Sequence, residues 1–236
     1  MTGPRLRTAQ NSTDESKLQV PKESVLRLLD RGHLLVTGPV DKARWNYSPV
    51  LSWLQRARFR LVTQLLGANR YDDTLEIGYG SGIFLPELQR RSDRLYGVDI
   101  HRHASIVQQM LAEVGVQASL FVASAESIPI ESRSMDLIVS VSTLEYVPDQ
   151  RKAASEMHRI LRPEGKLAVV YPMPHVFSDV GLKLLTRESA AQYGDGRRTL
   201  LPALCERFAV VQRNRFPAWM PLPLQVYEAA LLAPRD

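Results

Sequence analysis

The chain contains a single cysteine among its 236 residues, Cys205. One cysteine cannot form a disulfide within the chain, and it excludes a zinc cluster built on several thiolates. Long apolar runs are also missing, because none reaches the roughly 18 to 20 residues that a membrane-spanning helix needs. The polar start, MTGPRLRTAQNSTDESK, lacks the apolar centre of a secretory signal. These absences lead us to expect a soluble, cytoplasmic protein with a reduced thiol and no transmembrane segment.

Acidic residues are scarce in the first part of the chain. Residues 1–70 contain twelve Lys or Arg against five Asp or Glu, whereas the whole chain has 30 against 25. A basic N-terminal part can attract an acidic substrate, a nucleic acid or a membrane surface. The simpler interpretation is a solvated helix face and a loose tail, since residues 1–20 are polar and lack apolar periodicity. We expect those first residues to form a flexible tail.

Two helices are predicted in an N-terminal helical lid over residues 21–69. The first runs from Glu23 to a break at Gly32, on the apolar spacing of its valine and leucines. The second has Ser48 as its N-cap and Pro49 as its first helical residue. Three basic side chains of this second helix are expected to point mostly outward: Arg56, Arg58 and Arg60.

Strand and helix patterns alternate through residues 70–236. Apolar runs such as Met135–Val141 and Lys166–Tyr171 are typical of strands covered on both faces. The alternation predicts an α/β domain with a doubly wound, mostly parallel seven-stranded sheet and helices on both faces. The last two strands follow each other without a helix, so we expect the final strand to be antiparallel. The predicted strands are 74–77, 94–99, 118–123, 135–141, 165–171, 208–215 and 225–233, and the predicted helices are 83–90, 103–114, 150–161 and 200–207.

An insertion over about residues 172–199 interrupts this alternation. Ligands of open α/β sheets bind beyond the carboxyl ends of the strands, and both the insertion and the N-terminal helices can fold over that edge. We therefore expect both segments to act as substrate lids.

A glycine-rich turn, Glu76-Ile77-Gly78-Tyr79-Gly80-Ser81-Gly82, follows the first predicted strand. Glycines permit positive φ and let a ligand approach the backbone, and the following helix begins with free N–H groups. The turn predicts a nucleotide-like ligand, although a plain tight turn needs similar residues. Asp99 ends the next strand, where a carboxylate can accept hydrogen bonds from both ribose hydroxyls or, alternatively, cap a helix.

Two residues distinguish between nucleotide-like ligands. A dinucleotide fingerprint needs glycine three positions after Gly80, where this chain has Ile83. Negative charge on Glu76 would oppose a pyrophosphate and attract a ligand that carries an ammonium and a sulfonium. These residues favour S-adenosyl-L-methionine over NAD.

Further segments follow the turn and Asp99 in a fixed order. They are Ala123–Pro129, Met135–Ser140, Leu144–Asp149 and Leu161–Gly165. Together these motifs make residues from about 70 to 172 similar to the class I S-adenosylmethionine-dependent methyltransferases, particularly the group acting on small molecules. The resemblance implies a Rossmann-like methyltransferase fold and methyl transfer to a small organic acceptor, on oxygen, nitrogen or carbon.

The resemblance also implies a cofactor site. Gly78 and Gly80 would approach the methionine part, Asp99 would hold the ribose, Ile100 would pack on adenine, and the Ser140 carbonyl would meet the amino group. The family's usual adenine aspartate falls here on a serine, which is a weaker, neutral acceptor. The complete implied set is Glu76, Gly78, Tyr79, Gly80, Gly82, Asp99, Ile100, Ser124, Ala125, Glu126 and Ser140.

Methyl transfer from a sulfonium is an in-line displacement, in which positioning supplies most of the catalysis. A general base is needed only where the acceptor must lose a proton. His175, just after the fifth predicted strand, and Glu145, after the fourth, are the candidate catalytic residues. His33 and Tyr47 in the N-terminal lid are candidate substrate contacts. No histidine has metal-ligand spacing, so metal-independent transfer is expected.

Two other functions compete with small-molecule methylation. One is an RNA methyltransferase that uses the basic N-terminal segment against phosphates, but no RNA-binding module and no Asn/Asp-Pro-Pro-Tyr/Phe motif is present. Nucleic acid is therefore not the expected partner. The other is a non-catalytic cofactor-binding scaffold, suggested by Ser124. The sequence leaves the acceptor and the oligomeric state open.

Overall fold

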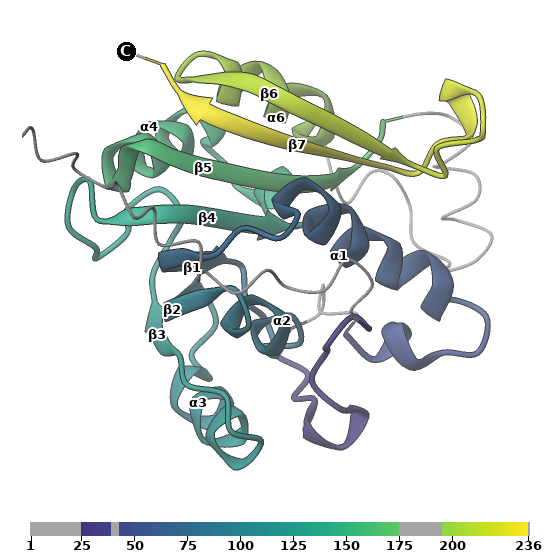
Figure 1. The fold of residues 1–236 in the computed structure, drawn as a ribbon, viewed down its shortest axis with the longest axis vertical. Coiled ribbons are helices and arrows are strands. Elements are labelled where there is room, and N and C mark those ends of the chain that lie inside the picture. The colour runs from purple at the N-terminus through teal and green to yellow at the C-terminus, as the bar shows by residue number, and fades with distance from the viewer. Residues whose placement is uncertain (1–24, 39–42, 175–194, 236) are drawn as a thin grey trace, which may run out of the picture.

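The computed structural model describes residues 25–38, 43–174 and 195–235. Its centre is a seven-stranded sheet with the order β3-β2-β1-β4-β5-β7-β6 (Figure 1). The strands are β1 Tyr71–Ile77, β2 Ser92–Asp99, β3 Ser119–Val122, β4 Met135–Val141, β5 Leu161–Pro172, β6 Phe208–Phe216 and β7 Tyr227–Pro234. Strands β1 to β5 pair in parallel, and β7 runs antiparallel to both of its neighbours. The predicted fold class is confirmed, including the antiparallel last strand.

Helices pack on both faces of the sheet. They are α1 Ser52–Leu66, α2 Leu85–Gln89, α3 Ala104–Glu113, α4 Gln150–Ile160 and α6 Gly196–Cys205, with short 3-10 turns η1 Arg31–His33, η2 Ala43–Tyr47, η3 Leu144–Tyr146 and η5 Leu222–Leu224. Apolar residues of α1, α2 and α3 form one core cluster, and those of α4 and α6 form a second one. Within the described residues, no helix is long and apolar enough to cross a membrane.

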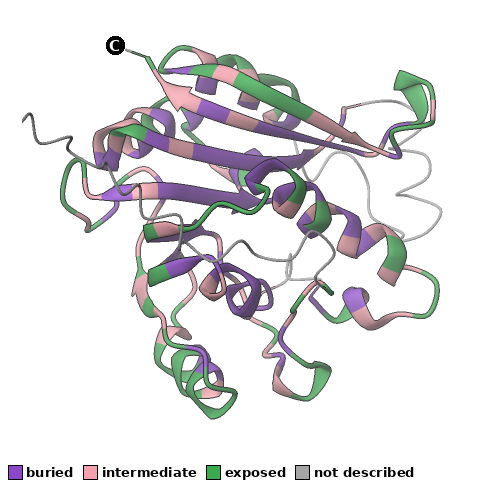
Figure 2. Ribbon diagram, in the orientation of Figure 1, coloured by how far each residue is buried: buried purple, intermediate pink, exposed green. Residues whose placement is uncertain are grey.

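The central strand β4 shows why continuous apolar runs predict this sheet. Val139 belongs to the core on the α1 side and Ile138 to the core on the α4 side, so both strand faces are covered. Figure 2 shows the middle of the sheet as buried, with exposed residues at the periphery. A strand buried on both faces has no reason to alternate apolar with polar residues.

The first predicted helix, from Glu23 to Gly32, is wrong for the part that the structure describes. Residues 25–30 are not helical. The Leu29 N–H donates to the Ile83 carbonyl, and the Arg27 N–H donates to the Glu87 carboxylate. The segment therefore uses its backbone donors on the α2 region, where a helix would need them for itself.

The second predicted helix begins later than expected. α1 starts at Ser52 and not at Pro49. A turn precedes it, in which the Ser48 carbonyl accepts the Ser52 N–H and the Ser48 hydroxyl accepts the Leu51 N–H. Ser48 satisfies backbone donors as predicted, but it does so ahead of the helix.

Candidate active site

A cavity of about 560 Å³ opens at the carboxyl edge of the sheet. The chain leaves β1 for β2 and β3 and then returns to β4 on the other side of β1, which makes this edge the point where the strand order reverses. The ends of β1, β2 and β4 form one wall, and α1 contributes another. Charged and ring-bearing side chains in the lining are Arg58, Phe59, Glu76, Tyr79, Asp99, His101 and Tyr146.

The three positions of the turn require glycine for different structural reasons. All have positive φ: +80° at Gly78, +52° at Gly80 and +75° at Gly82. A β-carbon on Gly78 would overlap the Thr143 side chain, and one on Gly82 would press against α3. Above Gly80 the nearest atom is the Thr37 hydroxyl oxygen, 3.9 Å from an added β-carbon. Gly80 is therefore the glycine that leaves room for a ligand.

Asp99 ties the end of β2 to the glycine turn. Its Oδ2 accepts the Gly80 N–H at 2.8 Å, and its Oδ1 accepts the His101 N–H at 3.3 Å. A carboxylate offers about four acceptor positions, so two remain for a ligand. The alternative role as a helix cap is wrong, because α3 begins at Ala104 with His103 as its N-cap.

His101 braces the same turn and lines the cavity. Its Nε2 lies 2.9 Å from the Gly80 carbonyl oxygen, and its Nδ1 accepts the His103 N–H at 3.1 Å. Since Nδ1 accepts, the neutral ring carries its proton on Nε2 and donates it to Gly80. The ring also meets Tyr79 edge-on at 4.9 Å. His101 lies two residues after Asp99 in the sequence, and this spacing alone does not reveal its contact with Gly80.

Glu76 is buried inside the cavity wall, with 3% of its surface exposed. Its pKa is raised from 4.5 to about 8, mainly by burial and also by the Asp99 charge, while the Arg58 charge lowers it. Its buried Oε2 has no hydrogen-bond partner among the described residues. Burial therefore favours the neutral carboxyl, whereas the sequence argument took Glu76 as charged, and a nearby cation would favour its ionised form.

Arg58 faces the cavity, which contradicts the expectation that it points outward. Its charge lowers the pKa of both Glu76 and Glu145, so the guanidinium lies within electrostatic range of two buried carboxyls. The sequence does contain a signal that Arg58 faces the sheet. Arg58 lies four residues after Leu54 and three before Leu61, at the margin of the apolar stripe of α1.

Glu145 lies in η3 and is also buried, with 3% of its surface exposed. Its pKa is raised from 4.5 to about 7 by burial, against the lowering effects of its own backbone N–H and of the Arg58 and Arg197 charges. Neither carboxyl oxygen receives a hydrogen bond from another described residue. Thr143 and Tyr146 line the cavity, whereas Glu145 is not among the lining residues.

The predicted cofactor residues divide into two groups. Six of them line the cavity: Glu76, Gly78, Tyr79, Gly80, Asp99 and Ile100. The lining does not include Gly82, Ser124, Ala125, Glu126 or Ser140. The Ser124 hydroxyl accepts the Glu126 N–H, and the Ser140 hydroxyl donates to the Ile77 carbonyl, so both are engaged locally.

The predicted substrate contacts lie apart from the cavity lining. The Tyr47 hydroxyl donates to the Leu29 carbonyl, and His33 lies in η1. His175 falls outside the described residues. Among the residues that the structure describes, no group of three or more His, Cys, Asp or Glu is arranged to hold a metal ion.

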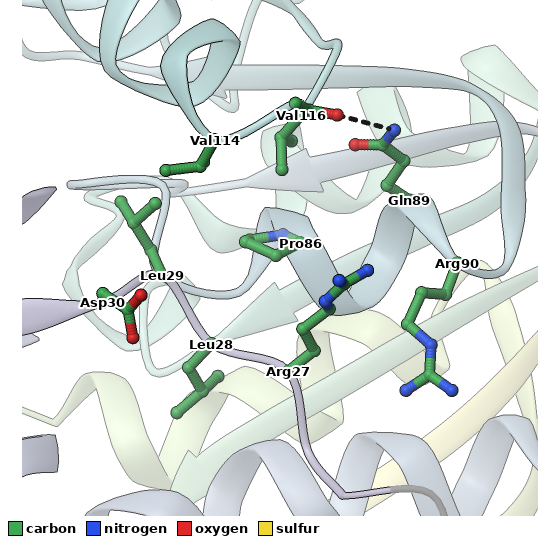
Figure 3. Close-up of a pocket in the computed structure, with 10 residues that line it drawn as sticks. Arg27, Leu28, Leu29, Asp30, Pro86, Gln89, Arg90, Val114 and Val116 are labelled. Carbon is green, nitrogen blue, oxygen red and sulfur yellow. Dashed lines mark hydrogen bonds between the residues drawn. The ribbon is translucent and has the colours of Figure 1, made fainter.

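A second pocket, of about 300 Å³, lies between the N-terminal segment, α2 and the end of α3. Figure 3 shows Leu29, Val114 and Val116 on one side of it and Arg27 and Arg90 together on the other. It shares no lining residue with the first cavity. None of its side chains has a buried polar atom without a partner, so nothing in it points to a ligand.

Comparison with known proteins identifies the central domain. Residues 75–169 match a family model described as a methyltransferase domain. The uncharacterized methyltransferase YdaC of Bacillus subtilis is 27% identical over 110 residues, which cover 44% of this chain and 58% of that protein. The ubiquinone biosynthesis O-methyltransferase of Alkalilimnicola ehrlichii is 23% identical over 158 residues, which cover 64% of each. The chain thus spans less than two thirds of the length of both relatives.

A solved structure of similar fold extends the comparison beyond the domain. The N-methyltransferase NodS from Bradyrhizobium japonicum WM9, in complex with S-adenosyl-L-homocysteine, has a TM-score of 0.59 at 19% identity. The match covers 85% of this chain and 95% of NodS. Residues 75–169 are therefore a methyltransferase domain, and the chain has the fold of the class I S-adenosylmethionine-dependent methyltransferases, as its motifs predict.

Proposed function

We propose that this protein binds S-adenosylmethionine in the cavity and transfers its methyl group to a small organic acceptor. The observation that carries the proposal is the meeting of three features in one cavity of a methyltransferase domain. Gly80 leaves open space, Asp99 keeps acceptor positions, and Glu76 has a buried Oε2 without a hydrogen-bond partner among the described residues. Each matches a different part of the cofactor.

The cavity suits this cofactor in size and in chemistry. A volume of about 560 Å³ lies within the range of small-molecule and cofactor sites. Asp99 would accept from the ribose hydroxyls and Ile100 would pack on the base. Glu76 would hold the ammonium of the amino-acid part, and Arg58 would face its carboxylate. Gly78, Tyr79 and the other predicted cofactor residues around the turn stay part of the proposed site.

The chain's own contribution to the reaction is mainly positioning. When bound, the cofactor supplies a methyl group on a sulfonium, which is a good leaving group. The walls around Phe59, Val141 and Tyr146 would hold an acceptor in line and keep water away. We propose Glu145 as the base for an acceptor that must lose a proton, because its raised pKa of about 7 suits that task. Since Glu145 is not among the lining residues, this role requires η3 to bring the carboxyl to the acceptor. His175 is the second proposed base.

Ligand binding and methyl transfer test the proposal in two steps. Calorimetry is expected to show S-adenosylhomocysteine binding at micromolar concentration and no NAD binding. A radiolabelled methyl donor is then offered with a panel of phenols, amines and carbon acids. Absence of S-adenosylhomocysteine binding overturns the proposal. Binding without transfer to any acceptor class would favour the non-catalytic scaffold.

A further inference from the structure

An exposed apolar surface lies where the β6–β7 connection meets the start of α1. From Phe216 to Tyr227 the chain contains no charged residue. Trp219 has 77% of its surface exposed, and Leu222 and Leu224 are nearly half exposed. Surface connections are usually polar, and clustered exposed apolar residues mark interaction sites. We call residues 217–224 the apolar loop.

The apolar loop is ordered, so its exposure does not come from a lack of structure. Its base is closed by the Val226 N–H, which donates to the Phe216 carbonyl at 2.7 Å. Inside it, the buried Gln225 side chain donates to the Met220 carbonyl at 2.9 Å. Figure 1 shows the loop extending beyond the ends of β6 and β7, and Figure 2 shows it as exposed.

α1 extends this apolar surface. The Trp53 ring lies 4.8 Å from the Phe216 ring at the base of the loop. Trp53 is itself 55% exposed, and Val50, one turn earlier, is 76% exposed. Two tryptophans and several aliphatic side chains are therefore presented by two neighbouring elements.

The charges around this surface have one predominant sign. Residues 43–71 contain five arginines and no acidic residue; Arg58 faces the cavity and Arg70 pairs with Asp93, which leaves Arg44, Arg56 and Arg60. Arg56 and Arg60 follow Trp53 at spacings of three and seven, which places them on its face of α1. Arg213 and Arg215, toward the carboxyl end of β6, both pair with Glu228, which offsets part of their charge.

We propose that the apolar loop, with Trp53 and Val50, docks this protein on the surface of a membrane that contains anionic lipid. Tryptophan favours the boundary between headgroups and acyl chains, and the flanking arginines complement anionic headgroups. The loop leaves β6 at its carboxyl end, and β6 runs parallel to β1, so the loop lies at the same edge of the sheet as the cavity. The proposal does not depend on methyl transfer.

Vesicle co-sedimentation of the full chain tests the proposal. Vesicles of phosphatidylcholine with phosphatidylglycerol are expected to carry the protein down, and vesicles of phosphatidylcholine alone to carry down much less. Trp219→Ser is expected to reduce binding about tenfold, because it removes the most exposed ring. Leu222→Ser is expected to act in the same direction. Val122→Ser is the matched control, since Val122 is half exposed on β3 at the opposite edge of the sheet.

Three outcomes would overturn the proposal. The first is unchanged vesicle binding by Trp219→Ser when circular dichroism shows the variant folded, which would assign binding to another basic segment. The second is equal binding to vesicles with and without phosphatidylglycerol. The third is no vesicle binding together with a dimer that Trp219→Ser dissociates, which would make this surface an interface between protein chains.

Discussion

At the scale of single residues, Asp99 connects the fold to the proposed ligand. Its carboxylate holds the Gly80 and His101 N–H groups and faces the cavity. Replacement by Ala is expected to weaken S-adenosylhomocysteine binding by about 1.5 to 3 kcal/mol, the range for hydrogen bonds to charged groups, which is about 10- to 150-fold. Calorimetry measures this change.

A matched control for Asp99→Ala lies on the same strand. Asp93 stands near the amino end of β2 and pairs with Arg70 on the surface. Asp93→Ala is expected to bind S-adenosylhomocysteine like the unaltered chain. Equal affinity of the two variants would mean that the ribose is held elsewhere.

Substitutions of Gly78 and Gly80 are expected to affect different properties: the first mainly the stability of the fold, the second mainly the affinity for the ligand. Gly78→Ala would overlap Thr143 and should lower the free energy of unfolding by at least about 2 kcal/mol. Gly80→Ala meets no close atom, so its backbone strain should cost only about 1 kcal/mol. Its β-carbon would nevertheless occupy ligand space and reduce S-adenosylhomocysteine affinity about tenfold or more.

Denaturant unfolding and calorimetry, carried out on both glycine variants, measure the two effects. Unchanged affinity of Gly80→Ala would show that no ligand approaches the backbone there. Equal stability of the two variants would contradict the different packing of the two glycines.

At the scale of elements, the strands could be predicted and the N-terminal segment could not. β4 was predicted with its observed bounds because both of its faces are covered, which leaves a continuous apolar signal in the sequence. The segment around Leu29 carries helical spacing, yet it is extended against the α2 region because Ile83 and Glu87 take its N–H groups. Such a tertiary partner leaves no local signal.

In the candidate site, too, some residues could be predicted from the sequence and others could not. The turn and Asp99 could be found because glycine and a strand-end carboxylate have fixed positions in this type of fold. Arg58 could not be placed from charge alone, since a helical arginine is usually solvated. Its spacing from Leu54 and Leu61 does place it beside the apolar stripe of α1, and the packing of that stripe on the sheet turns the guanidinium toward the cavity.

Arg58 on α1 gives a prediction about pH dependence. Its charge lowers the pKa of Glu76 and of Glu145, so Arg58→Leu should raise both. When the folded-state pKa of a buried carboxyl is higher, the folded protein loses stability over a longer pH interval, from the unfolded-state pKa up to the folded-state pKa. Between about pH 5 and pH 9, Arg58→Leu should therefore lose more free energy of unfolding than the unaltered chain does. The expected difference is at least about 1 kcal/mol, which corresponds to roughly one pKa unit, and thermal unfolding measures it.

Arg60→Leu is the control for Arg58→Leu, because Arg60 is exposed on the same helix. It is expected to keep the pH dependence of the unaltered chain. Identical pH profiles for both variants would contradict an electrostatic effect of Arg58 on the two carboxyls.

At the scale of the whole molecule, the buried carboxyls of the active site lower the stability of the folded protein at alkaline pH. Burial gives Glu76 a folded-state pKa of about 8 against its ordinary value of 4.5, and gives Glu145 about 7. The folded state therefore holds these protons more tightly than the unfolded chain does. The stability that they contribute is complete below about pH 4.5 and is lost as the pH rises through the folded-state values.

Glu76→Gln should remove much of this slope, because an amide cannot ionise. We expect the variant to lose less stability than the unaltered chain between about pH 5 and pH 9, with a difference on the order of a few kcal/mol at the alkaline end. Glu145 should leave a residual slope between its ordinary pKa of 4.5 and its folded-state pKa of about 7. Denaturant unfolding across this interval measures both, and Glu164→Gln, at an exposed carboxyl, is the control. If Glu76→Gln and the unaltered chain lose stability in parallel, the pKa of Glu76 is not raised, and the carboxyl is ionised in the folded protein at neutral pH. The negative charge from which the sequence argument inferred a cationic ligand would then be present even without the ligand.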